Sequence, residues 1–333
     1  MSRSTSEPRA AVSRRGFHRR AAASLAGGLS LGGFGSRRAT ASAFQETAAS
    51  NEATIYIDMH THLGQPWGKG QPITVDHMLR WMDEHRIDKV VVLPLISPEA
   101  WYYPISTDWV LRQTKPHRDR LLPFCDVDPR TNYLGGYRGM LDILKRYQDA
   151  GAVGFGEHKC AGPIDQPGNL DAFHAASELG FPILFHMDSI RNTDKPGLPG
   201  LEKVLRQTPN SNFIGHAQGW WASISGDLIE SQMGGYPSGP VARGGAIDRL
   251  MEKYPNLYAE FSAGSGANSL RRDPKFGRQF LIRRADRLMF GTDYLAVGQN
   301  IPQFELFDQF DLPADVQAKI FRDNARSLLG LDS

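Results

Sequence analysis

Eight short runs of β-branched and other apolar residues recur along the chain at nearly regular spacing, and this spacing constrains the fold most. The runs begin near residues 54, 89, 120, 152, 182, 212, 257 and 287. Between them, stretches such as 75–86, 134–151, 169–180 and 246–254 have apolar residues three and four positions apart, which is typical of amphipathic helices. Eight strand-then-helix units of this size predict an α/β protein with a single (β/α)8 TIM barrel.

An open doubly wound sheet is the alternative arrangement of alternating strands and helices. No glycine-rich phosphate-binding loop follows the first run, and polar residues follow many runs rather than the few that border one crevice. The barrel is therefore the favoured fold. The longest interval between runs separates the sixth from the seventh and predicts a long loop insertion after strand 6, at about 219–245, over the top of the barrel.

The first 43 residues differ in composition from the rest of the chain. They contain eight arginines and one acidic residue, Glu7. Ser13-Arg14-Arg15-Gly16-Phe17 is similar to the twin-arginine export signal, and a weakly apolar stretch and the small-residue run Ala41-Ser42-Ala43 follow it. We therefore expect a twin-arginine-type signal peptide at 1–43, a barrel domain at 44–333, and export to the periplasm or another extracytoplasmic compartment. A disordered basic tail is the alternative.

The net charge of the whole chain, +2, hides the charge of the expected barrel domain. Without residues 1–43, 30 of the 38 basic and 35 of the 36 acidic residues remain, so the net charge is near −5. An acidic domain argues against a nucleic-acid-binding surface. No uncharged apolar run reaches the roughly 18 to 20 residues of a membrane-spanning helix. We expect a small-molecule substrate, and the sequence does not indicate an oligomeric state.

Histidine and aspartate stand at the ends of several runs. His60 and His62 are two residues apart on one face of the first strand, so their imidazoles converge. His186 ends the fifth run, His216 the sixth and Asp293 the eighth. In a barrel these ends share the carboxyl-terminal face, where catalytic residues gather. Imidazole and carboxylate ligands without thiolates favour Zn²⁺, with Fe²⁺, Mn²⁺ and Co²⁺ as alternatives.

This ordered set resembles the metal-dependent amidohydrolase superfamily, and within it the amidohydrolase-related branch that includes small lactonases and non-oxidative decarboxylases. The resemblance covers nearly all of residues 54–331, including an ending with Asn324-Ala325-Arg326. It implies a metal ion held by His60, His62, His186 and Asp293. It also implies that His216 lies beside this ion, as a ligand of a second metal or as a substrate contact.

The fourth run offers three candidate ligands in succession, Glu157, His158 and Lys159. Branches of the superfamily place a carboxylated lysine, a glutamate or no ligand at this point. The Gly156-Glu157 pair is similar to the form found in TatD-like nucleases, so Glu157 is the predicted ligand. A packed imidazole and a surface cation are the alternative interpretations of His158 and Lys159, and one or two metal ions both remain possible.

A water activated by a divalent metal ion is a strong nucleophile near neutral pH. Asp293 could take its proton, and His216 could donate a hydrogen bond to the developing oxyanion. We therefore expect hydrolysis of an amide, lactone or ester. The resemblance leaves non-oxidative decarboxylation of a carboxylated ring as the alternative, followed by TatD-like nuclease activity and a non-catalytic binding barrel.

Aromatic and basic residues after the strand ends indicate the kind of substrate. Trp220 and Trp221 follow the sixth run, and Arg130 follows the third. An aromatic rim with guanidinium groups suits a small anionic ring, so we expect these three residues to contact substrate. The alternative is that the aromatic residues pack the long loops onto the barrel.

Overall fold

The structure is a computed structural model, and it describes residues 55–66, 70–100, 103–132 and 134–331. The expected signal peptide at 1–43, with Arg14 and Arg15, lies outside the described residues. Its export function therefore stays a prediction.

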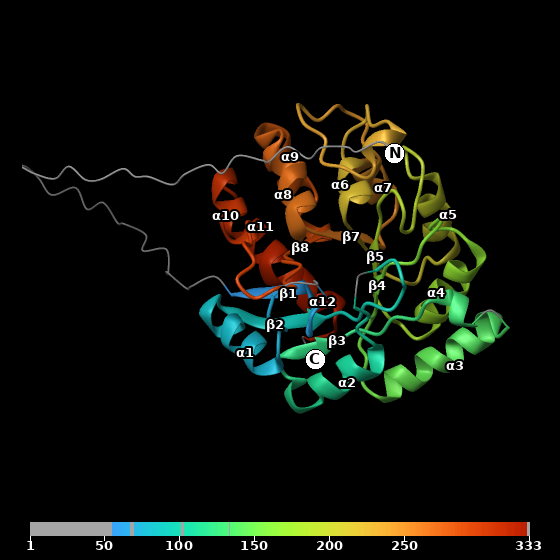
Figure 1. Ribbon diagram of the computed structural model, residues 1–333. Helices are drawn as coiled ribbons and strands as arrows, with labels where there is room; N and C mark the ends of the chain where they lie inside the picture. Colours follow the sequence, from blue (N-terminus) through green and yellow to red (C-terminus); the bar gives the residue numbers. More distant parts are fainter. Residues whose placement is uncertain (1–54, 67–69, 101–102, 133, 332–333) are drawn as a thin grey trace, which may run out of the picture. The chain divides into compact units, whose positions relative to one another are not determined.

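Eight parallel strands follow one another in the predicted order (Figure 1). They are β1 (Tyr56–Thr61), β2 (Ile87–Val92), β3 (Leu121–Pro123), β4 (Phe155–His158), β5 (Ile183–His186), β6 (Phe213–His216), β7 (Leu257–Glu260) and β8 (Leu288–Met289). Strands β1 to β3 pair in one group and β4 to β8 in another. Backbone hydrogen bonds join the groups: Cys125 donates to Gly154 at 2.9 Å, and Met59 donates to Phe290 at 3.0 Å. The eight strands therefore form a closed barrel.

Helices surround this barrel, except that α12 (Asn324–Leu328) lies over its middle in the view of Figure 1. They are α1 (Val75–Glu84), α2 (Thr107–Thr114), α3 (Gly136–Asp149), α4 (Pro167–Glu178), α5 (Pro199–Gln207), α6 (Gln218–Ala222), α7 (Ala246–Lys253), α8 (Ala263–Arg271), α9 (Pro274–Arg283), α10 (Gln303–Leu306), α11 (Ala314–Ala318) and α12 (Asn324–Leu328). Helix α1 shows why such segments form, because Thr74 caps it through the His77 amide and Met78, Trp81 and Met82 make one buried face. No helix within the described ranges is long and apolar enough to cross a bilayer.

Apolar side chains fill the interior of the barrel. The strands contribute Ile57, Met59, Val91, Leu93, Leu122, Phe124, Leu184, Ile214 and Met289, and Ala325 of α12 joins them. Because these side chains come from strands around the whole barrel and touch one another, the interior is a packed core and not a pore. A polar site must therefore lie at an end of the barrel.

The connection between β6 and β7 contains α6, one 3-10 turn (Glu230–Gln232) and α7. Its stretch 223–245 has no other helix or strand, whereas residues 219–222, the first part of the insertion expected at about 219–245, belong to α6. Gln218 and Tyr236 from this connection line the cavity at the carboxyl ends of the strands.

Candidate metal centre

Four predicted ligands meet on one side of the site. His60 and His62 lie in and just after β1, Glu157 lies in β4, and Asp293 lies just beyond β8. The Nε2 atoms of His60 and His62 are 3.2 Å apart. Each is 3.6 Å from Glu157 Oε2, and they are 3.5 and 3.4 Å from Asp293 Oδ1.

The other oxygen of Glu157 faces a second pair of imidazoles. Glu157 Oε1 is 2.7 Å from Nδ1 of His186, at the end of β5, and 3.6 Å from Nε2 of His216, at the end of β6. Two groups with metal-ligand spacing contain Glu157: one includes His60 and His62, and the other includes His186 and His216. A third group, His60, His216 and Asp293, does not contain it. The Glu157 carboxylate is therefore shared by the first two groups.

The hydrogen bonds of the imidazoles show that this donor set fits divalent cations. His62 Nδ1 donates to the Leu93 carbonyl at 3.0 Å, and His60 Nδ1 donates to Glu260 Oε1 at 3.0 Å. In the neutral rings the Nε2 atoms therefore carry lone pairs, and these lone pairs face one another and the carboxylate oxygens. Buried acceptor atoms packed this closely repel one another unless a proton or a cation lies between them, and their nitrogen and oxygen chemistry suits a divalent metal ion.

The three candidates on β4 point to different sides because side chains alternate along a strand. Glu157 and Lys159 share the site side, where Lys159 Nζ is 3.2 Å from Glu157 Oε1. His158 is fully buried on the opposite side and bonds Asp126 at 2.9 Å and Asn169 at 3.0 Å. The packed-imidazole interpretation therefore describes His158, whereas Lys159 is buried beside Glu157 and is not a surface cation.

Two residues at the end of β7 complete the site, and sequence reasoning missed both. Glu260 is fully buried, and its Oε1 lies 3.0 Å from His60 Nδ1 and 2.7 Å from His216 Nδ1. Ser262 Oγ donates to the same oxygen at 2.8 Å. Carboxylates that hold the second nitrogen of metal-binding histidines fix ring orientation and tautomer. The signal that could have found Glu260 is its position at the carboxyl end of the seventh predicted strand.

Burial and mutual charge set the ionisation of this cluster. Burial lowers the pKa of His60, but the Asp293 and Glu157 carboxylates raise it more, to well above its ordinary value. Burial raises the pKa of Glu157, but Lys159 and His60 together bring it well below its ordinary value. Burial and the charge of His60 lower the pKa of His216. The pKa of Asp293 is also lowered, because His60 and His62 outweigh its burial.

A cavity of about 470 Å³ opens onto this cluster. Its walls include Lys159, His186, Arg191, His216, Gln218, Tyr236, Ala263, Gly264, Ser265, Asp293, Gln299 and Asn300. The Asp293 side chain is 17% exposed, whereas those of His60, His62 and Glu157 are 0 to 1% exposed. Asp293 is therefore the carboxylate of the cluster that meets an entering molecule.

The three predicted substrate contacts lie elsewhere. Trp220 and Trp221 are 0 and 1% exposed, and the Trp221 ring stacks on Phe261 with centroids 4.7 Å apart. Neither indole borders the cavity, so the structure supports the packing alternative, in which α6 turns both rings into the core. Arg130 bonds Asp128 and Glu99 and does not border the cavity either. The cationic side chains in the cavity wall are Lys159 and Arg191.

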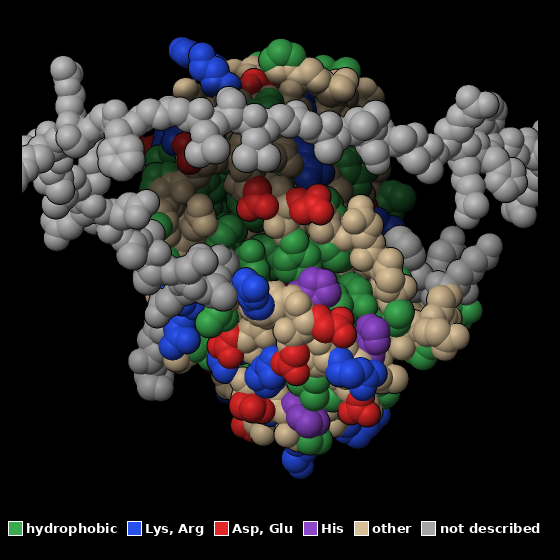
Figure 2. Space-filling model, turned by 90° about the vertical axis from the view of Figure 1, so that its left-hand side faces the viewer, with side chains coloured by type: hydrophobic (Ala, Val, Ile, Leu, Met, Phe, Trp, Pro, Cys, Tyr) green, Lys and Arg blue, Asp and Glu red, His purple; other side chains and the backbone are tan. Residues whose placement is uncertain are grey.

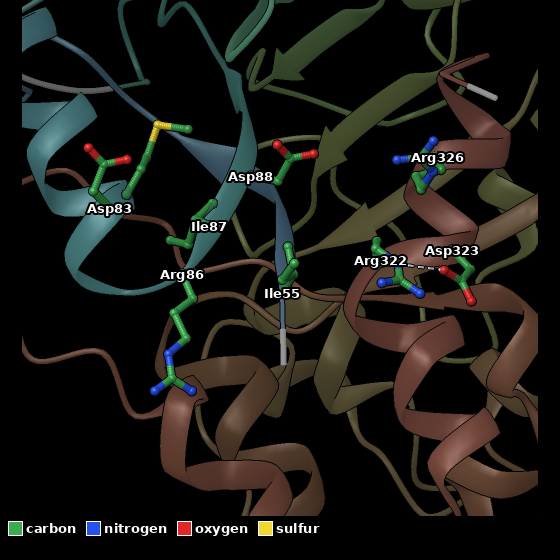
Figure 3. A pocket seen from close by; sticks show the side chains of 9 residues that line it. Ile55, Asp83, Arg86, Ile87, Asp88, Arg322, Asp323 and Arg326 are labelled. Carbon is green, nitrogen blue, oxygen red and sulfur yellow. Dashed lines mark hydrogen bonds and ion pairs between the residues drawn. The ribbon is translucent and has the colours of Figure 1, made fainter. Parts of the chain in front are cut away.

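A larger hollow of about 750 Å³ lies at the other end of the barrel (Figure 3). Ile55, Ile87 and Asp88 border it where β1 and β2 begin, and Arg322 and Arg326 come from the carboxyl-terminal segment. Its three aspartates and three arginines balance in charge, and no predicted ligand borders it. On the face in Figure 2, basic and acidic side chains are likewise interspersed. The candidate site is therefore the cluster at the carboxyl ends of the strands.

Solved structures with similar folds share low sequence identity with this chain. An uncharacterised TIM-barrel protein from Bordetella bronchiseptica superposes with a TM-score of 0.58 at 16% identity, covering 83% of this chain and 99% of the other. A putative 2-pyrone-4,6-dicarboxylic acid hydrolase from Pseudomonas putida gives 0.55 at 16% identity, with 84% and 98% covered. A dihydroxybenzoic acid decarboxylase from a Polaromonas species, with bound manganese and the inhibitor 2-nitroresorcinol, gives 0.53 at 15% identity, with 84% and 98% covered. At these identities the likeness establishes the fold.

No curated protein sequence matches the chain. The sequence model of one family, described as amidohydrolase (Amidohydro_2), matches residues 57–331, which include every strand but the first residue of β1. This range contains all the residues of the buried histidine and carboxylate cluster. With most of its length matched, the chain belongs to the amidohydrolase family Amidohydro_2.

Proposed function

We propose that this chain is a metal-dependent hydrolase that binds two divalent ions and acts on an amide, lactone or ester of a small anionic substrate. The observation that carries the proposal is the position of the Glu157 carboxylate, with Oε2 toward His60 and His62 and Oε1 toward His186 and His216. One carboxylate between two pairs of imidazoles would suit a pair of divalent cations.

The residues divide between two ion positions. His60, His62 and Asp293 would hold the first ion, His186 and His216 the second, and Glu157 both. His216 belongs with the ligands because its Nδ1 hydrogen is held by Glu260, which leaves the Nε2 lone pair toward Glu157. Zn²⁺ is the favoured ion, since the donors are nitrogen and oxygen atoms. Bound there, divalent ions would supply Lewis acidity that lowers the pKa of a water molecule and polarises a carbonyl oxygen.

Asp293 would move the proton. Its carboxylate is the one open to the cavity, and its lowered pKa keeps it ionised near neutral pH. It can therefore accept the proton of the attacking water and pass it to the leaving group. The Gln299 side chain donates to the Asp293 backbone carbonyl at 2.8 Å and holds this segment in place.

Decarboxylation of a carboxylated substrate is the second candidate reaction. The observation that favours it is the presence of Lys159 and Arg191 in the cavity wall, where a substrate carboxylate could lie near the metal ligands. We prefer hydrolysis because an ionised Asp293 open to the cavity could accept a proton from water, whereas decarboxylation instead needs a proton donor at the carbon atom that loses CO₂.

The test counts metal ions and follows products. We expect two equivalents of divalent metal in the wild-type protein and at most one in Glu157→Gln, which keeps the size of the side chain but loses its charge. Glu202→Gln is the matched control, because Glu202 pairs with Arg249 and Lys253 outside the cluster. Two equivalents in Glu157→Gln would contradict the shared carboxylate. Lactones, esters and amides should release acid, whereas CO₂ release from carboxylated aromatics alone would favour decarboxylation.

A further inference from the structure

The first turn of α8 forms part of the wall of the metal-centre cavity. Ala263, Gly264 and Ser265 border the cavity, and α8 runs for nine residues. Ser262, which precedes the helix, contacts His216 Nδ1 through its hydroxyl at 2.8 Å. The Ala263 amide donates to the Thr292 carbonyl at 3.4 Å, next to Asp293. The start of α8 therefore lies between two residues of the metal centre.

The amino-terminal amides of α8 lack the usual partners. The Ser262 hydroxyl donates to Glu260 Oε1 and does not cap the helix, and the first turn contains no acidic residue. Glu260 Oε2 accepts the Ser262 amide, but no partner is found among the described residues for the amides of Gly264 and Ser265. The first amides of a helix have no partner within it and carry its positive end, so they favour an anion.

The side chain of Ser265 independently indicates a ligand. Ser265 is 3% exposed, and its hydroxyl has no hydrogen-bond partner within the described part of the chain. Ser269, one turn later, donates to the Gly266 carbonyl at 2.7 Å, so a serine hydroxyl in this helix can form a hydrogen bond to a backbone carbonyl of the same helix. A buried hydroxyl without a partner is costly unless a bound group supplies one.

The cationic side chains of the cavity are already paired with carboxylates. Lys159 Nζ lies 3.2 Å from Glu157 Oε1, and Arg191 bonds Asp188. The start of α8 has no such compensation in its first turn. Two helices, α8 and α9, lie between β7 and β8, so one of them is additional to the usual single helix of a strand-helix unit. TIM barrels frequently bind phosphate at the amino terminus of such an extra helix near strands seven and eight, and α8 begins in this region.

We propose that the Ser265 hydroxyl and the amides of Gly264 and Ser265 bind a terminal oxyanion of the substrate, a carboxylate or a phosphate. This inference rests on the proposed function in one respect: it takes the bound anion to be part of the substrate of the metal centre. It places the anionic group on the β7 side of the cavity, and Lys159 and Arg191 on the β4 and β5 side then face the remainder of the substrate.

The test titrates inorganic phosphate and acetate into the metal-loaded protein and measures the dissociation constants by calorimetry. Ser265→Ala should weaken binding of at least one probe about tenfold, the loss expected for one hydrogen bond to a charged group. The probe that loses affinity identifies the chemistry of the oxyanion. Without anion, the melting temperature of Ser265→Ala should equal or exceed that of the wild type, because the hydroxyl has no partner to lose. A clear drop in melting temperature would indicate a structural role for Ser265 instead.

Gly264→Asp supplies an internal anion at the same turn and should abolish the Ser265-dependent binding. A Cβ atom at this position would lie 3.3 Å from the ring of Tyr236, its nearest neighbour, and Tyr236 is 52% exposed, so its ring has room to shift. Asn300→Asp is the matched control, because it adds the same charge to the cavity wall away from α8 and should change affinity less than about threefold.

Wild-type affinity in both Ser265→Ala and Gly264→Asp would overturn the proposal, because the probes would then bind only at the metal ions. Equal losses in Gly264→Asp and Asn300→Asp would also overturn it, since the effect would be one of general charge. Binding is measured without turnover, so these results stand apart from the proposed hydrolysis. Hydrolysis without Ser265-dependent anion binding would refute only the proposed anion site. Ser265-dependent anion binding without hydrolysis would refute only the proposed reaction.

Discussion

Replacing Glu260 by glutamine should weaken metal binding although Glu260 is assigned no bond to a metal ion. Its Oε1 accepts hydrogen bonds from His60 Nδ1 and His216 Nδ1, and its Oε2 accepts the Ser262 amide at 2.6 Å. A glutamine amide has one acceptor oxygen. If the glutamine oxygen faces the two histidines, the glutamine NH2 group faces the Ser262 N–H, and two donors then oppose each other. If the amide is flipped, both histidines lose their hydrogen-bond acceptor.

The size of the effect follows from the number of ligands that Glu260 orients. Loss of such an outer carboxylate costs about 10- to 100-fold in metal affinity, equivalent to about 1.4 to 2.7 kcal/mol. Because His60 and His216 are assigned to different proposed ion positions, both binding steps should weaken. The buried donors left without a partner should also lower the free energy of unfolding of the metal-free protein by about 1 to 3 kcal/mol.

Competition with a chelating metal indicator measures both affinities, and urea unfolding of the metal-free protein measures the stability. Ser262→Ala is the matched control, because it removes the hydroxyl that contacts Glu260 and His216 Nδ1 but leaves the Glu260 carboxylate in place. We expect a smaller loss of metal affinity in Ser262→Ala than in Glu260→Gln. Unchanged affinity at both ion positions in Glu260→Gln would refute the reasoning that this carboxylate orients the histidines.

Three further outcomes are expected. Asp293→Asn should retain partial metal occupancy and lower kcat by about 10² to 10⁴, as for a positioned base, and full metal content with near-wild-type turnover would remove Asp293 from that role. The raised pKa of His60 keeps the metal-free site protonated near pH 7, so metal affinity should rise with pH and binding of the first metal ion should release about one proton. Calorimetry in buffers of different ionisation enthalpy would measure this proton release, and binding without it would contradict the prediction. Replacing Arg14 and Arg15 with lysine should leave unprocessed precursor in the cytoplasm, and normal processing on immunoblots would remove the export hypothesis.

The strand order and the convergence of the histidines could be predicted because each depends on a local pattern. Apolar runs at regular intervals specify strands and helices, and a barrel places every strand end on one face. His186 and His216 could therefore be placed beside His60 and His62 although they are more than a hundred residues away in sequence. The structure confirms all eight predicted strands, with starts within three residues of the predicted ones.

The orientation of residues beyond the strand ends could not be predicted, because a loop has no period. Trp220 and Trp221 follow a strand end as a substrate-contacting pair would, but α6 begins at Gln218 and turns both indoles inward. Gly215 allows this, since a Cβ at that position would lie 2.3 Å from the Trp220 ring. Arg130 lies after the third strand, where Asp128 and Glu99 hold its guanidinium group. In each case a long-range contact decides the position of the side chain.

The residues that hydrogen-bond to the ligands and to the strand ends could not be predicted from the sequence. Their contacts show how the structure holds the ligands in place. Behind the site, Asn192 Nδ2 donates to the carbonyls of His158 at 2.6 Å and His186 at 2.9 Å, so one side chain ties the ends of β4 and β5 together. Glu260 does the same for ligands from β1 and β6. The position of Glu260 at a strand end is a weak signal, because glutamate and asparagine are common there and the sequence does not show which ligands they contact. Since such ties join the ends of different strands, they hold in place the strand ends that carry the ligands, and thereby set the spacing of the two proposed ion positions.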